Sequence, residues 1–243
     1  MPGSWVRRTL KANEGAVAAL KRQDPDLFER LGKGQSPRSA TAECADSRVR
    51  SSVLTETRPG ERFAVIRNAG VIVRPDDRGA GATLQYWLSH LKGDEPRFIE
   101  HFIHRKCGAV GAAAAAFKAA ETGEHGGHTV EEIIAEHVGH MKPAWDFVSS
   151  NKAGIPEEDL VEVFNEANGI AQIANYTLLP GVGVPLKKAL DDGRVKIIPY
   201  VQGIHEGAHE GRLEHGYPLL EKYGLLQKAM KAFGVNPKHV HLP

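Results

Sequence analysis

Cysteine is scarce in this chain of 243 residues, which contains only two, Cys44 and Cys107. Two cysteines can form one disulfide at most, so a fold held together by many disulfides is excluded. Long apolar runs are also lacking, and none approaches the roughly 18 residues of a membrane-spanning helix. The first residues, MPGSWVRRTL, contain no apolar core of signal-peptide length. We therefore expect a cytoplasmic protein with no membrane partner.

The chain has no excess of charge of either sign. It carries 31 basic and 30 acidic residues, for a formal net charge of +1. A balance of this kind creates no overall field that would attract nucleic acid or an anionic membrane. The G-x-x-x-x-G-K-[ST] pattern of phosphate-binding loops is absent as well, although glycines gather around residues 79–81. We therefore expect no nucleic-acid partner.

The remaining composition is typical of a globular domain, with 41% hydrophobic and 25% charged residues. We expect one domain over residues 1–243. Residues 4–34 carry apolar side chains at near-helical spacing, so residues 1–35 should form a helical arm. Residues 216–243 hold closely spaced apolar side chains and should form a C-terminal helical extension, read as one amphipathic helix.

Between these ends, short apolar segments alternate with helical patterns. The expected strands are 39–43, 62–67, 97–103 and 195–201, and the expected helices are 83–91, 108–121, 129–141, 143–152 and 156–178. A glycine-rich loop should occupy residues 76–82. Pro199 indicates that the later part of its strand lies at an edge or a bulge. The alternation predicts an α/β fold with a central, mostly parallel β-sheet flanked by helices.

Both cysteines stand beside residues that metal sites use. Cys44 is followed by Asp46 and Arg48, and His104 precedes Cys107 by three residues. A catalytic zinc ion takes three protein ligands and keeps a fourth position open, so Cys44, His104 and Cys107 would complete its first shell. Ligands bind at the carboxyl ends of strands in such sheets, which is where Cys44 and His104 are expected. The sequence therefore predicts a Zn²⁺ site formed by these three residues.

Other pairings of metal-binding residues are possible. Cys44 and Cys107 could form one disulfide, but a reducing compartment and their His and Asp neighbours favour metal ligation. His137 with His140, or His205 with His209, has a spacing that suits a metal. Such spacings are expected by coincidence in a chain with 12 histidines, so we interpret these four as surface or core residues. Arg105 and Lys106, two basic residues in one turn, should be solvated.

Three motifs, in order, carry a family resemblance. Cys44-x-Asp46-Ser47-Arg48, Arg67-Asn68-Ala69-Gly70 and His104-x-x-Cys107-Gly108-Ala109 resemble those of the β-class carbonic anhydrases. The similarity extends over most of residues 9–215. Departures lie at the pocket rim: Val71 stands where the family often has Asn, and Arg105 and Lys106 stand where it has small or acidic residues.

The resemblance implies an enzyme, a carbonic anhydrase, which is a zinc lyase. Its reaction would be the reversible hydration of CO2 to bicarbonate by attack of zinc-bound hydroxide. Asp46 and Arg48 would be the catalytic residues: Asp46 accepts a hydrogen bond from the hydroxide, and Arg48 holds Asp46. Arms such as residues 1–35 pack across a partner subunit in this family, which implies a homodimer or a higher homo-oligomer.

Two other functions are compatible with the same zinc ligands. Relatives with this shell hydrolyse carbonyl sulfide (COS) or carbon disulfide (CS2), whose carbon is also electrophilic. A non-catalytic, zinc-containing scaffold protein is the alternative of another class. Asp46 and Arg48 argue against a scaffold, because a structural zinc ion needs neither and normally has four protein ligands.

Overall fold

The computed structural model describes residues 2–91, 96–122, 132–204 and 211–243. The chain divides into two compact units, Met1–Ser36 and Pro37–Pro243. The first unit contains two helices, α1 (Pro2–Gln23) and α2 (Leu27–Gly32). They agree with the helices predicted for residues 4–34. Within this unit the Arg30 guanidinium pairs with the carboxylate of Asp24, just after α1 ends.

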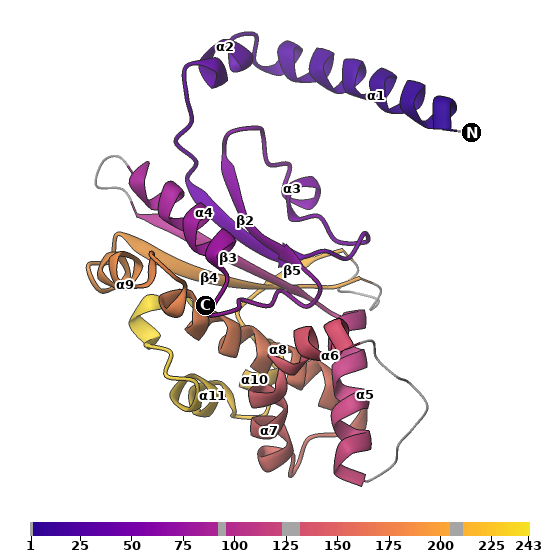
Figure 1. Cartoon of the computed structure of the whole chain (residues 1–243), viewed down its shortest axis with the longest axis vertical. Coiled ribbons are helices and arrows are strands. Elements are labelled where there is room, and N and C mark those ends of the chain that lie inside the picture. Colours follow the sequence, from indigo (N-terminus) through magenta and orange to yellow (C-terminus); the bar gives the residue numbers. More distant parts are fainter. Residues whose placement is uncertain (1, 92–95, 123–131, 205–210) are drawn as a thin grey trace. The chain divides into compact units, whose positions relative to one another are not determined.

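The second unit is built on a five-stranded sheet (Figure 1). Its strands are β1 (Ser39–Cys44), β2 (Arg62–Asn68), β3 (Arg97–His104), β4 (Val195–Gln202) and β5 (Leu213–His215). They lie in the order β2-β1-β3-β4-β5, and every pair is parallel except β4 with β5. This arrangement confirms the predicted α/β fold with a mostly parallel sheet.

Helices connect and flank these strands. Among the described residues they are α3 (Ser51–Leu54), α4 (Arg78–Ser89), α5 (Gly108–Thr122), α6 (Glu132–Gly139), α7 (Lys142–Asn151), α8 (Glu157–Asn175), α9 (Gly183–Asp191), α10 (Pro218–Lys222) and α11 (Leu226–Ala232), with short 3-10 turns η1 (Tyr176–Leu178) and η3 (Pro237–His239). In the described part of the chain, no helix combines the length and the apolar character that crossing a membrane requires. The first residues of the helix predicted for 129–141 lie outside the described residues.

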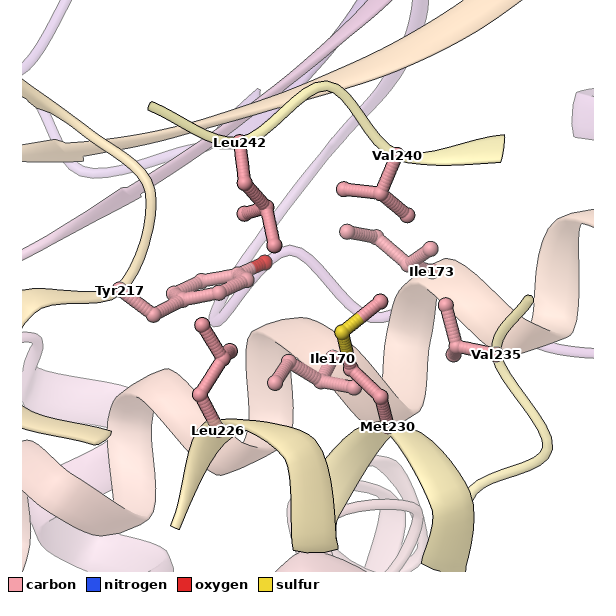
Figure 2. Close-up of a pocket in the computed structure, with 8 residues that line it drawn as sticks. All are labelled: Ile170, Ile173, Tyr217, Leu226, Met230, Val235, Val240 and Leu242. Carbon is pink, nitrogen blue, oxygen red and sulfur yellow. The ribbon is translucent and has the colours of Figure 1, made fainter. Parts of the chain in front are cut away.

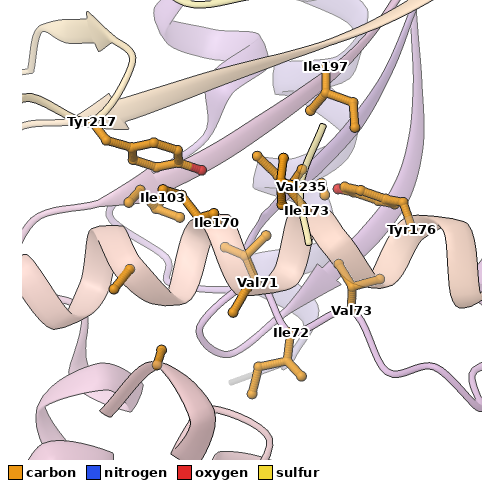
Figure 3. Packing of buried hydrophobic residues seen from close by; sticks show 14 of the residues in the cluster. Val71, Ile72, Val73, Ile103, Ile170, Ile173, Tyr176, Ile197, Tyr217 and Val235 are labelled. Atoms are coloured by element: carbon orange, nitrogen blue, oxygen red, sulfur yellow. The ribbon is translucent and has the colours of Figure 1, made fainter. Parts of the chain in front are cut away.

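The main core lies between one face of the sheet and α8. Figure 3 shows Ile170 and Ile173 of α8 packed near Ile103 of β3 and Ile197 of β4. All four residues are at most 3% exposed. Helix α8 begins with Glu157, Glu158 and Asp159 after Pro156, as expected for a helix whose first turn favours negative charge. The apolar face of α8 therefore packs against one face of the sheet.

The central strands also bury polar side chains. The Glu100 carboxylate accepts a hydrogen bond of 2.6 Å from the Ser39 hydroxyl and pairs with Arg62 at 2.7 Å. His101 points the other way, and its Nδ1 lies 3.0 Å from the hydroxyl oxygen of Tyr176. Buried polar groups need such partners. These contacts explain how β3 accommodates Glu and His in an otherwise apolar strand.

The start of one predicted helix differs clearly from the structure. Helix α4 begins at Arg78 rather than at residue 83, because the Asp77 carboxylate caps it by accepting the N–H of Ala80 at 2.9 Å. The expected glycine-rich loop is thus largely helical. Gly81 is needed there, since a Cβ would stand 2.4 Å from the carbonyl oxygen of Pro180. Helix α9 was not predicted at all.

The expectation for Pro199 is wrong. Strand β4 pairs with β3 along its whole length without a bulge, and β5 covers its later part from Tyr200 onward. The Pro199 carbonyl accepts the N–H of Gly216, so it faces the β5 side. A residue in a strand directs its N–H and C=O to the same side. The donor that proline lacks would therefore face the β5 side, just where pairing with β5 begins.

The C-terminal extension forms two short helices and η3 rather than one helix. Gly224 and Gly234, which follow α10 and α11, have φ angles of +65° and +69°, a conformation that glycine tolerates and that ends helices. The extension packs on α8 of its own chain. Figure 2 shows Tyr217, Leu226 and Met230 gathered over Ile170, around a hollow with no room for a water molecule. The hollow is a narrow gap between packed side chains.

Candidate metal centre

Two neighbouring strands bring the three proposed metal ligands together. Cys44 ends β1 and His104 ends β3, and these strands are paired in parallel, so their carboxyl ends meet. Cys107 follows within the same turn as His104 and directly precedes α5, which starts at Gly108. Their possible ligand atoms all lie within 4.8 Å of one another, and all three residues are buried. The structure therefore groups the three residues that the sequence singled out.

The sulfur positions suit a tetrahedral metal ion. Cys44 and Cys107 are free cysteines, and their Sγ atoms lie 3.9 Å apart. Two sulfur ligands about 2.3 Å from a tetrahedral ion would stand about 3.8 Å apart. A disulfide would require about 2.05 Å. The separation therefore fits two thiolate ligands of one ion.

The imidazole of His104 is oriented for the same purpose. Its Nδ1 lies 2.9 Å from the carbonyl oxygen of Arg105, so Nδ1 carries the proton and donates it. The lone pair is then on Nε2, which is buried and has no hydrogen-bond partner among the described residues. A buried acceptor without a partner is costly. Zinc coordination would satisfy it, so the donor set fits the ion.

The two thiols influence each other's ionisation. A hydrogen bond from Cys107 lowers the pKa of Cys44, and the N–H of Gly70, which is 3.4 Å from the Cys44 sulfur, lowers it further. The neighbouring Cys44 and burial raise the pKa of Cys107. One thiolate thus forms readily and disfavours the second. A divalent cation would stabilise both.

Asp46 and Arg48 form a charged pair at the edge of this group. The Arg48 guanidinium donates to both Asp46 oxygens, at 2.9 Å from Nε and 2.6 Å from Nη2, and the Arg48 backbone N–H donates a third hydrogen bond. These bonds lower the pKa of Asp46, which therefore stays ionised. Its Oδ2 lies 3.9 Å from Nε2 of His104. A carboxylate acceptor is thus held beside the proposed ligands.

The loop after β2 closes the other side of the group. Gly70 has a φ angle of +80°, and a Cβ there would stand 2.2 Å from the Met141 side chain. Val71 also lies in the left-handed region, with φ of +55°, which is unusual for a β-branched residue. Asn tolerates this region better than Val. The departure at residue 71 therefore concentrates backbone strain next to the site.

Sequence reasoning missed a network behind Cys44. Buried Glu43 accepts hydrogen bonds from the backbone and hydroxyl of Ser51 and pairs with Arg67 at 2.6 Å. The Arg67 guanidinium also donates to the carbonyl of Val49. These contacts fix the segment that contains Asp46 and Arg48. The only signal for them was the unusual polarity of residues 39–43.

In the described part of the chain, the only group of three or more possible ligands is Cys44, His104 and Cys107, so His137 and His140 gain no third ligand there. His137 instead contacts the carbonyl oxygen of Ala69 through Nε2 at 2.8 Å. His205 and His209 lie outside the described residues. The expectation that Arg105 is solvated is wrong, because its side chain is only 8% exposed and pairs with carboxylates.

Comparisons with known proteins agree with this geometry. A family model described as carbonic anhydrase matches residues 40–209. A carbonic anhydrase of Pseudomonas aeruginosa is 33% identical over 187 residues, covering 74% of this chain and 76% of the relative. A carbonic anhydrase of Synechococcus elongatus is 29% identical over 188 residues, covering 75% of this chain and 62% of the relative. The chain thus spans less than two thirds of the cyanobacterial protein.

A solved structure shows the same fold. One of two tetrameric β-carbonic anhydrases from Sordaria macrospora superimposes with a TM-score of 0.69 at 21% identity, covering 87% of this chain and 96% of that chain. At this identity the likeness concerns the fold alone. The matched family model and the Pseudomonas relative, which cover most of the residues discussed above, establish that the chain belongs to the β-carbonic anhydrase family.

Proposed function

We propose that this protein catalyses the reversible hydration of CO2 to bicarbonate, with a zinc ion held by Cys44, His104 and Cys107. The observation that carries the proposal is the convergence of two sulfurs and an imidazole nitrogen within 4.8 Å, beside the Asp46–Arg48 pair. Membership of the carbonic anhydrase family supports it. A scaffold would need no ionised acceptor at this position.

The chemistry divides between the metal and the protein. A bound zinc ion would act as a Lewis acid and lower the pKa of coordinated water to about 7. Because Asp46 stays ionised, it can only accept a hydrogen bond. In this position it orients the attacking hydroxide, whose free lone pair then points at the carbon of CO2. A carbon–oxygen bond forms, one C=O π pair moves to its oxygen, and bicarbonate results.

Arg48 has a supporting role in this scheme. Its guanidinium ties the Asp46 carboxylate from one side and donates to the carbonyl oxygen of Lys106 at 3.2 Å. Arg48 thereby links the loop after Cys44 to the turn between His104 and Cys107. Because both oxygens of Asp46 already accept hydrogen bonds from Arg48, the carboxylate would be kept from binding the cation itself.

Three measurements on one preparation test the function. Zinc content should be about one ion per chain, stopped-flow assays with a pH indicator should detect CO2 hydration, and Cys107→Ala should lose both. Sulfide release from carbonyl sulfide is the third measurement. Hydration without sulfide release supports the proposal, while sulfide release without hydration would assign the site to COS or CS2 hydrolysis. A zinc-loaded protein with neither activity would be a scaffold.

Assembly and location extend the proposal. Within its own unit, α1 leaves Trp5, Val6 and Leu10 between 53% and 66% exposed. Apolar side chains gathered on one helix favour burial against another surface. We propose that a second copy of the chain supplies it, in a homodimer or a higher oligomer. Two free cysteines that serve as ligands suit the reducing cytoplasm.

A further inference from the structure

Arg105 lies between the two proposed ligands His104 and Cys107 in the sequence, and its backbone and its side chain make different contacts. Its carbonyl oxygen accepts the Nδ1 proton of His104 at 2.9 Å. Its guanidinium Nη2 lies 3.1 Å from an oxygen of Glu166 and 3.3 Å from an oxygen of Glu214. The side chain is 8% exposed. One buried residue therefore connects the imidazole to two carboxylates.

Glu166 continues the connection into the C-terminal extension. It lies on α8, is fully buried, and its Oε2 accepts the backbone N–H groups of Leu219 and Leu220, each at 2.9 Å. Its other oxygen faces Arg105. Glu214 belongs to β5, which precedes α10. Arg105 is thus reached by two routes, from β5 through Glu214 and from the first turn of α10 in the extension by way of Glu166.

The same turn has other supports, but these come from within the matched family region. The His104 carbonyl accepts a hydrogen bond from Asn165 at 2.8 Å, and the Lys106 N–H donates to Glu162 at 2.7 Å. Lys106 has a φ angle of +54°, so the turn is strained and needs fixing. The contacts of Arg105 differ, because Glu214 and α10 lie beyond residue 209, where the family match ends.

We propose that Arg105 is a positioning residue for the metal site, through which β5, by Glu214, and the C-terminal extension, by way of Glu166, set the orientation of His104. This inference rests on the proposed zinc site. An imidazole ligand takes its direction from the acceptor of its second ring nitrogen. That acceptor is the Arg105 carbonyl, whose position follows from where the guanidinium is held. A purely structural salt bridge would contribute stability but leave the zinc affinity unchanged.

The double variant Arg105→Met with Glu166→Gln tests the proposal. Removing both charges together avoids an unpaired buried charge, and the Gln oxygen can still accept from Leu219 and Leu220. Zinc affinity is measured by competition with a chelator, and the absorption spectrum of the Co²⁺-substituted protein reports ligand geometry. We expect a loss of zinc affinity of roughly 10- to 100-fold and an altered cobalt spectrum.

A second buried Arg–Glu pair provides the matched control. Arg62 and Glu100 lie 2.7 Å apart with side chains 17% and 10% exposed, and neither contacts the turn. Arg62→Met with Glu100→Gln should lower stability but keep the zinc affinity and the cobalt spectrum of the parent. Unchanged affinity in the Arg105 variant, or equal losses in both double variants, would overturn the inference.

Glu214→Gln is a milder test that serves if the double variant does not fold. Glu214 is 26% exposed at the side chain, so its substitution leaves the core intact. We expect about a threefold or greater loss of zinc affinity in the same direction, and parental affinity would contradict the proposal. CO2 hydration is measured on the same samples. A parent that binds zinc without hydrating CO2 refutes the function and not the positioning role.

Discussion

The Asp46 carboxylate shows how much of the site depends on one side chain. Hydrogen bonds from the guanidinium and the backbone N–H of Arg48 keep this carboxylate ionised and fix its direction, and Asp46 lies only two residues beyond Cys44. A second Arg–Asp pair with the same sequence spacing, Arg74 and Asp76, has a far more exposed carboxylate, 69% against 17% for Asp46. The Arg74–Asp76 pair therefore serves as a control for substitutions in the Asp46–Arg48 pair.

Asp46→Ala should keep the zinc ion but slow CO2 hydration, because the metal ligands are untouched and the hydrogen-bond acceptor is lost. We expect kcat to fall by roughly 100-fold or more, measured by stopped flow at known zinc content. Asp76→Ala should keep the parental rate. An Asp46→Ala protein as fast as the parent would remove the role proposed for this carboxylate.

Helix α8 supports both loops that surround the ligands. Asn165 donates to the carbonyl of His104, and Asn168 donates to the carbonyl of Gly70. Gln172 accepts the N–H of Val73 at 2.8 Å. An adjacent face of the helix carries the C-terminal extension, where a Cβ at Gly169 would stand 2.7 Å from the Tyr217 hydroxyl oxygen. A single helix therefore sets the spacing between the site and the extension.

Gly169→Ala should destabilise the protein by about 1–3 kcal/mol, because the buried Tyr217 ring must shift to admit the methyl group. Gly111→Ala in α5 is the control, since nothing lies within 4 Å of its Cβ position. It should stabilise by roughly 0.5–1 kcal/mol through helix propensity. Urea unfolding of the three proteins gives the values. A neutral Gly169→Ala would show that α10 is loosely packed.

At the scale of the whole molecule, α1 provides the clearest sign of assembly. The Trp5 side chain is 66% exposed and Leu10 is 59% exposed within a helix that has no acidic residue in its first turn. Replacing both with Glu should shift the protein from a dimer or larger species toward the monomer mass, as measured by light scattering after gel filtration. A parent that is already monomeric would contradict the proposed assembly.

Stability should also depend on pH through His101. Burial lowers its pKa from 6.5 to about 3. Between these values the unfolded chain binds a proton that the folded protein does not, so the free energy of unfolding falls as the pH drops below 6.5. The loss is about 1.4 kcal/mol per pH unit and levels off below pH 3.

His101→Gln should be less sensitive to acid than the parent. Between pH 6.5 and pH 5 the parent should lose about 2 kcal/mol more than the variant, since one proton is involved. Urea unfolding at both pH values, at equal zinc content, measures the difference. Equal losses in the two proteins would mean that another group controls acid unfolding.

The grouping of the three proposed ligands could be predicted from the sequence because it depends only on where individual strands end. Cys44 and His104 each follow an apolar or half-apolar segment, and the ends of neighbouring parallel strands meet. The helix start at Arg78 was missed because Gly79 and Gly81 suggested a loop, whereas the Asp77 cap and the contact of Gly81 with Pro180 decide the outcome. That contact joins residues about 100 positions apart in sequence, which propensity does not capture.

Arg105 illustrates the same limit near the site. Two adjacent basic residues in a turn are usually solvated, yet Arg105 is buried and Lys106 is exposed. The difference comes from Glu166 and Glu214, which approach from α8 and β5. Both partners are distant in sequence, so only the fold reveals which basic residue is paired. The polar residues of segment 39–43 likewise find their partners elsewhere in the chain, which the segment alone does not reveal.

The two cysteine sulfurs are 63 residues apart along the chain and 3.9 Å apart in space. A cation held between them would cross-link β1 to the turn after β3, closing a loop that contains β2 and α4. Pairing of β1 with β3 brings the two sulfurs to this separation. The ion would thus be captured late in folding and would afterwards slow the separation of the two central strands.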